Sequence, residues 1–201
     1  MYNSQPLLFA KDGLKGISSK TLDIHYDKLY QGYVKKKNEI EERLKATKPE
    51  GNATHSDWRE LKLEETFAAN GVYLHEYYFE VLGGTGAAGG DLSAALAQEF
   101  GSFEAWLADF TACGMSARGW VVLGLDTQDG RLHNYNGDMH NQGGVWGVLP
   151  IVVLDVYEHA YFIDYGSDRA KYLQDYFANL NWDAANKRYA LANAALRAMK
   201  H

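Results

Sequence analysis

Cysteine and basic charge are both scarce in this chain. Cys113 is the only cysteine among 201 residues, which excludes an intramolecular disulfide framework and a thiolate-rich zinc or iron–sulfur site. Lysine and arginine together number 20 against 26 acidic residues, so the formal net charge is −6. Such a chain lacks the basic field that holds nucleic acid, and we expect no nucleic-acid partner. An anionic substrate would need a local positive patch.

Long hydrophobic runs are missing as well. No segment reaches the roughly eighteen uninterrupted apolar residues of a membrane span, and the N-terminus lacks the basic and apolar regions of a secretory signal. We therefore expect a soluble, cytoplasmic protein with no membrane partner. Hydrophobic residues still make up 46% of the chain, which is ample for one core. With thiolates unavailable, the seven histidines are the candidate ligands to follow.

The first part of the chain has the pattern of a helical hairpin. Apolar and aromatic side chains recur at helical spacing after Ser18 and Ser19 and predict a helix to about Thr47. A second helix is predicted from near Asp57 to the glycine pair that begins at Gly83. The polar turn between the two helices predicts an antiparallel pair.

The remainder of the chain mixes helices and strands. The glycine-rich segment 83–90 marks a boundary between halves, which we place at 1–85 and 91–201. After it, the pattern predicts two short helices, three strands and a helical C-terminal region. The predicted helices span 91–99 and 102–116, and the strands are 120–126, the segment returning after the turn at 128–130, and 149–156.

An acid and a histidine stand four residues apart where the third predicted strand ends. Asp155 follows the apolar run PIVVL, where an ionised carboxylate is costly to bury without a partner, and His159 follows it at helical spacing. Such a pair can converge on one metal ion. Capping of the next helix by Asp155 explains the acid equally well, so this pair alone leaves both interpretations open.

Two further histidines lie on the apolar stripes of the predicted hairpin. His25 and His75 should face each other and point inward, because the two stripes face each other. One such histidine is more often a neutral core ring bonded to a neighbour. Two of them, together with Asp155 and His159, favour a site of three histidines and one carboxylate with a position left open. Iron, manganese and zinc suit such ligands better than magnesium or calcium.

The motifs around these residues resemble the iron/manganese superoxide dismutase family over nearly the whole chain. The matching strings are IHYDKLYQGYV (24–34), NGVYLHEYYFEVLGG (70–84), GW (119–120), DVYEHAYFIDY (155–165) and NW (181–182). The resemblance implies an α+β fold with an N-terminal antiparallel helical hairpin and a C-terminal α/β half containing a three-stranded antiparallel sheet. It also implies superoxide dismutation by one Fe or Mn ion per subunit, held by His25, His75, Asp155 and His159.

The resemblance assigns further residues to the site. Tyr33 matches the family's gateway tyrosine, and Trp120 matches a tryptophan that walls the metal, although both could be ordinary core residues. Gly71 occupies a position where one branch of the family carries a glutamine, which leaves room for a hydrogen-bond donor from the sheet. That donor is His140 by ungapped counting from Asp155, or Gln142 if a gap is allowed.

Other positions depart from the family pattern. Leu29 and Phe162 stand where members commonly carry a histidine and a tyrosine that pair across the dimer, and Tyr157 replaces a tryptophan. We therefore expect an altered substrate gate and lower activity, and a non-catalytic or weakly active metal-binding member is the alternative. Glu158 implies a homodimer, since in the family it reaches the ligand histidine of the other subunit; its other interpretation is a helix N-terminal acid.

The choice of metal and the capture of substrate complete the expectations. Lys28 and Arg169 match positions that line the family's substrate funnel and would supply a local positive patch for superoxide. We predict iron, or use of either metal. A non-haem iron oxygenase or a zinc hydrolase with the same ligands is a further rival, but the sequence carries no motif for its substrate cleft.

Overall fold

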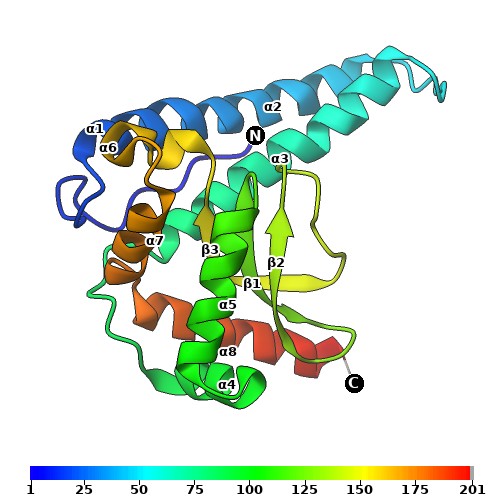
Figure 1. The fold of residues 1–201 in the computed structure, drawn as a ribbon. Helices are drawn as coiled ribbons and strands as arrows, with labels where there is room; N and C mark the ends of the chain where they lie inside the picture. The colour runs from blue at the N-terminus through cyan, green and yellow to red at the C-terminus, as the bar shows by residue number, and fades with distance from the viewer. Residues whose placement is uncertain (200–201) are drawn as a thin grey trace.

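The computed structural model describes residues 1–199, so residues 200 and 201 of the expected C-terminal half lie outside the described part. The N-terminal half contains α1 (Ser19–Ile24), a π-helix (His25–Tyr30), α2 (Gln31–Ala46) and α3 (Asp57–Glu80). Figure 1 shows α2 and α3 running side by side as a long hairpin that projects beyond the rest of the molecule. The hydroxyls of Ser18 and Ser56 cap α1 and α3 by accepting backbone N–H groups.

The π-helix places two functional candidates on one face. An α-turn takes 3.6 residues and a π-turn takes about one residue more, so one turn of each kind takes about eight residues. His25 begins the π-helix and Tyr33 lies eight residues later, after the return to α-helix. The two side chains therefore point the same way, toward α3 and the sheet.

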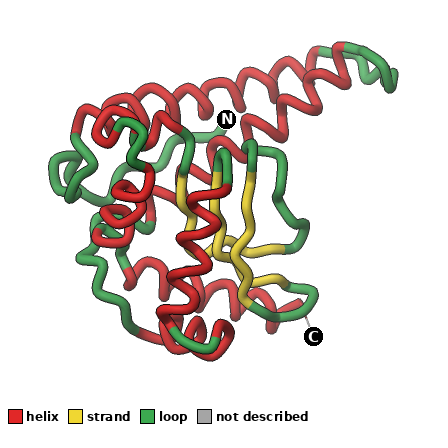
Figure 2. The backbone as a smooth tube through the Cα atoms, viewed as in Figure 1, coloured by secondary structure: helices red, strands yellow, loops and turns green. Residues whose placement is uncertain are grey.

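The C-terminal half is built around a three-stranded antiparallel sheet of order β2-β1-β3. Trp120 pairs with both Gly137 and Asp155, so these residues meet at one end of the sheet. The elements are α4 (Gly90–Phe100), α5 (Phe103–Ser116), β1 (Trp120–Asp126), β2 (Leu132–Gly137), β3 (Val148–Asp155), a 3-10 helix (Glu158–Ala160), α6 (Phe162–Tyr165), α7 (Arg169–Ala178) and α8 (Trp182–Met199). Figure 2 shows helices surrounding the strands, and the predicted fold class is confirmed.

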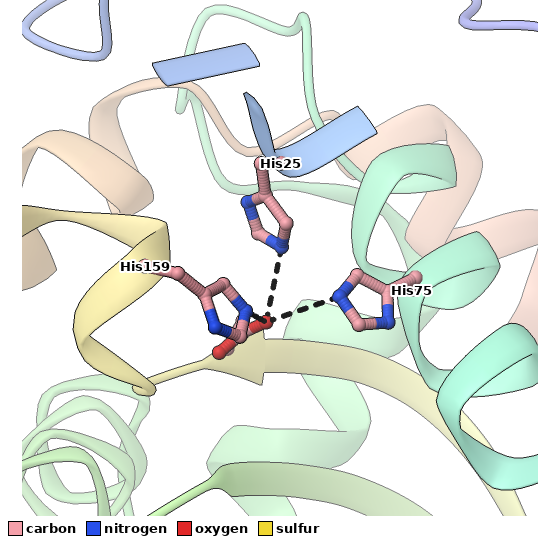
Figure 3. A group of neighbouring side chains, drawn as sticks. His25, His75 and His159 are labelled. Carbon is pink, nitrogen blue, oxygen red and sulfur yellow. Dashed lines mark hydrogen bonds and ion pairs between the residues drawn. The ribbon is translucent and has the colours of Figure 1, made fainter. Parts of the chain in front are cut away.

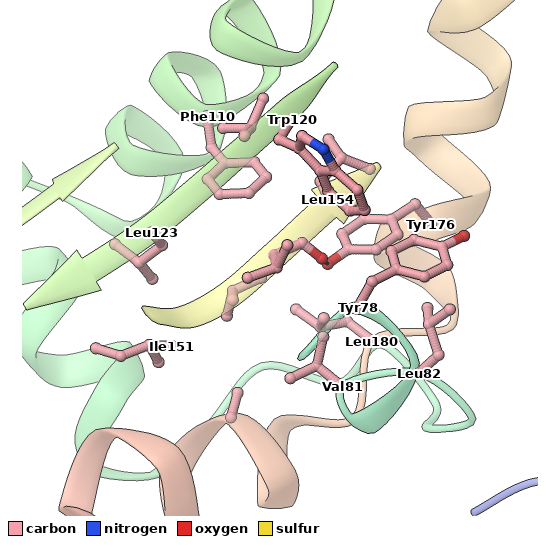
Figure 4. Close-up of a cluster of buried hydrophobic side chains, with 14 of the residues drawn as sticks. Tyr78, Val81, Leu82, Phe110, Trp120, Leu123, Ile151, Leu154, Tyr176 and Leu180 are labelled. Atoms are coloured by element: carbon pink, nitrogen blue, oxygen red, sulfur yellow. Dashed lines mark hydrogen bonds between the residues drawn. The ribbon is translucent and has the colours of Figure 1, made fainter. Parts of the chain in front are cut away.

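Both halves contribute to one main core. Aliphatic side chains of the sheet, such as Leu123 and Leu154, lie in the same cluster as Tyr78 of α3 and Tyr176 of α7 (Figure 4). The phenols inside this core are hydrogen-bonded: Tyr176 donates to the carbonyl of Val153 at 2.8 Å. Such bonds fix the end of β3, from which a candidate ligand extends.

No helix among residues 1–199 is long and apolar enough to cross a bilayer.

Candidate metal centre

Four side chains from four separate elements converge on one buried point. Figure 3 shows the imidazoles of His25, His75 and His159 turned toward a single carboxylate oxygen. That oxygen is Asp155 Oδ2, which lies 3.1 Å from His25 Nε2, 3.2 Å from His159 Nε2 and 3.7 Å from His75 Nε2. Ligand atoms about 2 Å from a shared ion lie about 3–4 Å apart, so these four atoms match the spacing of one coordination shell.

His75 supplies the sharpest sign that an ion belongs here. Its Nδ1 lies 2.5 Å from the carbonyl of Gly71, and because a carbonyl only accepts, Nδ1 carries the ring proton. His75 Nε2 then presents a lone pair, and among residues 1–199 it is the buried side-chain polar atom left without a hydrogen-bond partner. A buried orphan lone pair is costly unless a cation meets it.

The sequence position of Asp155 suggested either a capping role or a place beside the histidines, and its two oxygens serve both. Its Oδ1 accepts the backbone N–H of Tyr157 at 2.9 Å, while Oδ2 faces the histidines. Burial alone would raise the pKa of Asp155, but the charge and hydrogen bonds of His159 and His25 outweigh burial and hold that pKa below its usual range. The carboxylate is therefore ionised as a ligand must be.

The surroundings of the three histidines shift their pKa values in different directions. Burial lowers the pKa of His25, and burial with repulsion from His25 lowers that of His75 well below its ordinary value. Burial also acts to lower the pKa of His159, but Asp155 outweighs it and raises the pKa. The two hairpin histidines thus stay neutral, which is the form that binds metal.

A hydrogen-bonded chain runs beside the ligands from the sheet to the hairpin. Trp120 Nε1 lies 2.9 Å from His140 Nδ1, and His140 Nε2 lies 2.7 Å from the Tyr33 hydroxyl oxygen. An indole N–H can only donate, so His140 Nδ1 accepts and His140 Nε2–H donates to Tyr33. The proton of the Tyr33 hydroxyl is consequently free to point elsewhere. Gln142, the alternative to His140, is exposed in the loop after β2.

Two residues of α3 shape the space around the hydrogen bonds that link Trp120, His140 and Tyr33. A Cβ atom on Gly71 would lie 2.7 Å from Tyr33 Cδ1, so the glycine makes room for the Tyr33 ring. Phe67, which sequence reasoning missed, packs 4.5 Å from the ring centroid of His140. Phe67, Gly71 and His75 follow one another at four-residue spacing on α3, a helical stripe that could have identified it.

A second group of acids and a histidine lies on the β1–β2 hairpin, comprising Asp126, Asp129 and His133. Its carboxylates already accept hydrogen bonds from Tyr135, from His133 or from backbone N–H groups. We assign no metal to this group.

Comparison with known proteins agrees with this geometry. The family model described as iron/manganese superoxide dismutases, alpha-hairpin domain, matches residues 1–83, and the corresponding C-terminal domain model matches residues 88–188. Superoxide dismutase [Fe] of Aquifex pyrophilus is 41% identical over 193 residues, covering 93% of this chain and 91% of that protein. Superoxide dismutase [Fe] of Cupriavidus metallidurans is 38% identical, with 96% and 98% covered, and superoxide dismutase [Mn] 1 of Halobacterium salinarum is 34% identical, with 95% and 96% covered.

The chain belongs to the iron/manganese superoxide dismutase family. Its function is the dismutation of superoxide, and its cofactor is iron or manganese. The buried group of His25, His75, Asp155 and His159 can hold one such ion.

The Tyr157 ring forms a wall beside the candidate ligands. The Tyr157 ring stacks on His159, with centroids 5.3 Å apart and planes 14° from parallel, and it lies 5.3 Å from His140. Gly119 permits this placement, because a Cβ there would lie 2.9 Å from Tyr157 Cε2.

The remaining residues singled out by the superoxide dismutase resemblance lie around the outside of the site. Glu158 and Phe162 are exposed, and Phe162 retains 52% of its accessible surface. Lys28 is exposed on the π-helix, and Leu29 beside it is partly buried. Arg169 is anchored, since its guanidinium donates to the Ala117 carbonyl at 2.8 Å.

Proposed function

We propose that His25, His75, Asp155 and His159 hold the catalytic iron or manganese ion. The observation that carries this assignment is the convergence of three imidazole nitrogens and one carboxylate oxygen at a buried point, with His75 Nε2 otherwise unpartnered. When bound, such an ion would supply one-electron redox chemistry between its trivalent and divalent states, as conversion of superoxide to dioxygen and hydrogen peroxide requires. The protein holds the ion, excludes bulk water and delivers protons.

Tyr33 is the residue that we assign to proton delivery. His140 donates to the phenol oxygen of Tyr33, so the phenol proton is directed away from His140 and toward the space above the ligands. Burial, with the nearby Tyr157 and Asp155, raises the pKa of Tyr33 to about 12 and keeps the phenol protonated. Hydrogen peroxide leaves after taking two protons, and a protonated phenol at this place can pass them on.

His140 and Trp120 orient this proton donor. Trp120 fixes which nitrogen of His140 bears hydrogen, and the aromatic wall that Trp120 forms lies 5.1 Å from the His75 ring centroid. Lys28, with Arg169, supplies positive charge for the approach of the superoxide anion, which a chain of net charge −6 lacks as a whole.

We further propose a homodimer in a reducing, cytoplasmic compartment. The exposed Glu158 and Phe162 support the dimer, because they stand beside His159, where the family's subunits meet. The single free thiol, Cys113, supports the compartment.

Reconstitution tests the assignment of the site. Apoprotein loaded separately with iron and with manganese should bind one ion per chain and accelerate superoxide decay above the free-metal background. His75→Ala should lose the ion, as measured by elemental analysis after gel filtration, whereas His55→Ala, at an exposed position, should retain it. A loaded protein that does not accelerate superoxide decay would favour the non-catalytic alternative.

The role of His140 is tested by the ratio of the two metal-specific activities. His140→Gln replaces an imidazole donor to Tyr33 with an amide donor, which alters the hydrogen bonding that tunes the site. We expect the iron-to-manganese activity ratio to change severalfold in His140→Gln and to stay constant in Gln142→Ala. The reverse result would move the role to Gln142.

A further inference from the structure

A cavity separate from the candidate metal centre lies between the N-terminal segment, the π-helix and α3. Its volume is about 340 Å³, within the range of about 300–1,000 Å³ that is typical of small-molecule sites. Tyr26 and Tyr30 line it from the π-helix, and Tyr77 and Phe79 line it from α3. None of the four candidate metal ligands lines this cavity, and no step proposed above uses it.

Three aromatic rings form a continuous wall of the cavity. The Tyr26 ring centroid lies 5.3 Å from that of Tyr30 and 5.4 Å from that of Phe79. Tyr30 and Phe79 are buried, whereas Tyr26 is partly exposed. Aromatic rings attract cations electrostatically as well as packing against apolar groups. The wall therefore suits a ligand that combines an apolar part with a positive charge.

The carboxylate of Glu76 lines the same cavity and has no cation of its own. Glu76 Oε1 accepts the Tyr30 hydroxyl at 2.6 Å, and Oε2 accepts the Tyr2 hydroxyl at 2.7 Å. These bonds use two of the roughly four acceptor positions of a carboxylate. Among residues 1–199, no lysine, arginine or histidine forms an ion pair with Glu76, and Lys37, over the Tyr2 ring at 4.9 Å, pairs with Glu41. A partly buried negative charge is thus left for a cation from outside the chain.

The chain's own Arg188 shows how a cation is held at the edge of this cavity. Its guanidinium lies 3.9 Å from the Tyr77 ring centroid, and its Nη1 donates to Glu80 Oε2 at 2.7 Å. Tyr77 and Glu80 also line the cavity. A carboxylate beside aromatic rings therefore occurs twice along α3, and a side-chain cation satisfies the pair at Glu80 but not the pair at Glu76.

The N-terminal segment closes the cavity and gives it an apolar rim. The backbone N–H of Gln5 donates to the Tyr30 hydroxyl, and the Tyr26 hydroxyl donates to the Gln5 carbonyl, both at 2.7 Å. In Figure 1 this segment, in blue, runs beside α2 and α3. Pro6 and Leu8 also line the cavity, and Leu8 is 72% exposed. An alkyl chain can lie along this rim while a charged group reaches the carboxylate.

We propose that this cavity binds a small aliphatic amine in its ammonium form, with the ammonium group on Glu76 and the alkyl chain against Tyr26 and Phe79. An alkylamine resembles the lysine side chain, whose pKa of about 10.4 keeps it charged at neutral pH. Its N–H groups can donate to the two acceptor positions of Glu76 that the phenols leave free. Glu76 and Glu80 repel an anion, and a neutral ligand would leave the charge of Glu76 unmatched.

Isothermal titration calorimetry of the metal-loaded full chain with butylamine at pH 7 tests the proposal. Butylamine should bind saturably at one site, and butan-1-ol, which has the same alkyl chain without the charge, should bind about tenfold more weakly or less. Glu76→Gln should weaken the binding of butylamine by about tenfold. Glu64→Gln removes the same charge from an exposed position of the same helix and should leave the affinity unchanged.

A second pair of variants tests the aromatic wall without altering Glu76. Tyr26→Phe and Tyr26→Leu both lose the hydrogen bond to Gln5, but only Tyr26→Leu loses the ring, so only Tyr26→Leu should weaken butylamine severalfold. Hydrogen exchange should locate the site, because bound butylamine should slow exchange in segment 2–8 and not in segment 141–147. Circular dichroism should show the wild-type helix content in every variant.

Several outcomes of these titrations would contradict the amine site. Absence of saturable binding, or equal affinity for butylamine and butan-1-ol, would overturn it. An equal loss of affinity in Glu64→Gln and Glu76→Gln would show that the amine responds only to the overall negative charge. Protection of segment 141–147 in place of segment 2–8 would place the amine elsewhere.

Discussion

His140 is held neutral by its place between two hydrogen-bond partners of fixed character. Its Nδ1 accepts from the Trp120 indole, and a protonated ring would lose that bond. Burial lowers the pKa of His140 from 6.5 to about 4. Between pH 6.5 and about 4, this histidine therefore takes up a proton in the unfolded chain but not in the folded chain.

The stability of the protein should consequently fall as the pH drops through this window. Below pH 6.5 the unfolded chain gains a proton that folded His140 refuses, which lowers the free energy of unfolding by at most about 1.4 kcal/mol per pH unit. His140→Gln removes this contribution, so its free energy of unfolding should fall less steeply from pH 6.5 to 4. Urea unfolding at a series of pH values measures both slopes, and parallel curves would contradict the assignment.

The sequence was sufficient to predict which four side chains come together as proposed ligands, but not which residues support them. His25, His75, Asp155 and His159 lie in strings whose spacing could be compared with a family. The tautomer of His140, in the loop after β2, depends on Trp120, 20 residues away at the start of β1, and no spacing along the chain encodes that approach. Side chains meet there because the sheet register brings them together.

Among the elements, α3 carries a glycine whose missing side chain serves the site. Gly71→Ala would put a Cβ 2.7 Å from Tyr33 Cδ1 and force the ring to move. We expect about 1–3 kcal/mol of destabilisation and a clear loss of activity, because Tyr33 is displaced from His140. Thermal unfolding and superoxide decay measure the two effects.

Gly32 provides the matched control on α2. A Cβ there would meet nothing within 4 Å, so Gly32→Ala should stabilise the helix by about 0.5–1 kcal/mol and leave activity unchanged. If both substitutions behaved alike, helix propensity rather than the contact with Tyr33 would explain the result.

The boundaries of regular elements were predictable, but one irregular element was not. The strand predicted over 120–126 is β1 as observed, and the third strand begins one residue earlier than predicted. The predicted N-terminal helix contains a π-helix, His25–Tyr30, that the apolar pattern did not reveal. A π-turn shifts the spacing of the apolar residues by about one residue in eight. This shift is smaller than the width of the apolar stripe on an ordinary amphipathic helix, so the spacing does not reveal it.

For the whole molecule, a single chain leaves one of the proposed metal ligands without a partner for its second ring nitrogen. The hydrogen bond that His159 makes within residues 1–199 uses Nε2, toward Asp155, and its side chain is 25% exposed, so Nδ1 is accessible to a group from outside the chain. Ligating histidines almost always donate from their second nitrogen, usually to a carboxylate or carbonyl. The exposed Glu158 of a second copy, as proposed above, is such a carboxylate. The family resemblance suggests Glu158 of a second copy as this acceptor, whereas contacts within one chain do not include it.

Disrupting the proposed dimer should therefore weaken the metal site as well as the assembly. Phe162→Glu puts a charge into an apolar contact at a residue that is now 52% exposed, and should halve the mass seen by sedimentation. With Glu158 of the partner withdrawn from His159, the affinity for the ion should fall by about 10–100-fold in competition with a chelator. Glu158→Gln should keep more of the mass while weakening the ion similarly. Leu63→Glu, at an exposed leucine of α3, should change neither quantity, and a Phe162→Glu protein of unchanged mass and affinity would place the dimer contact elsewhere.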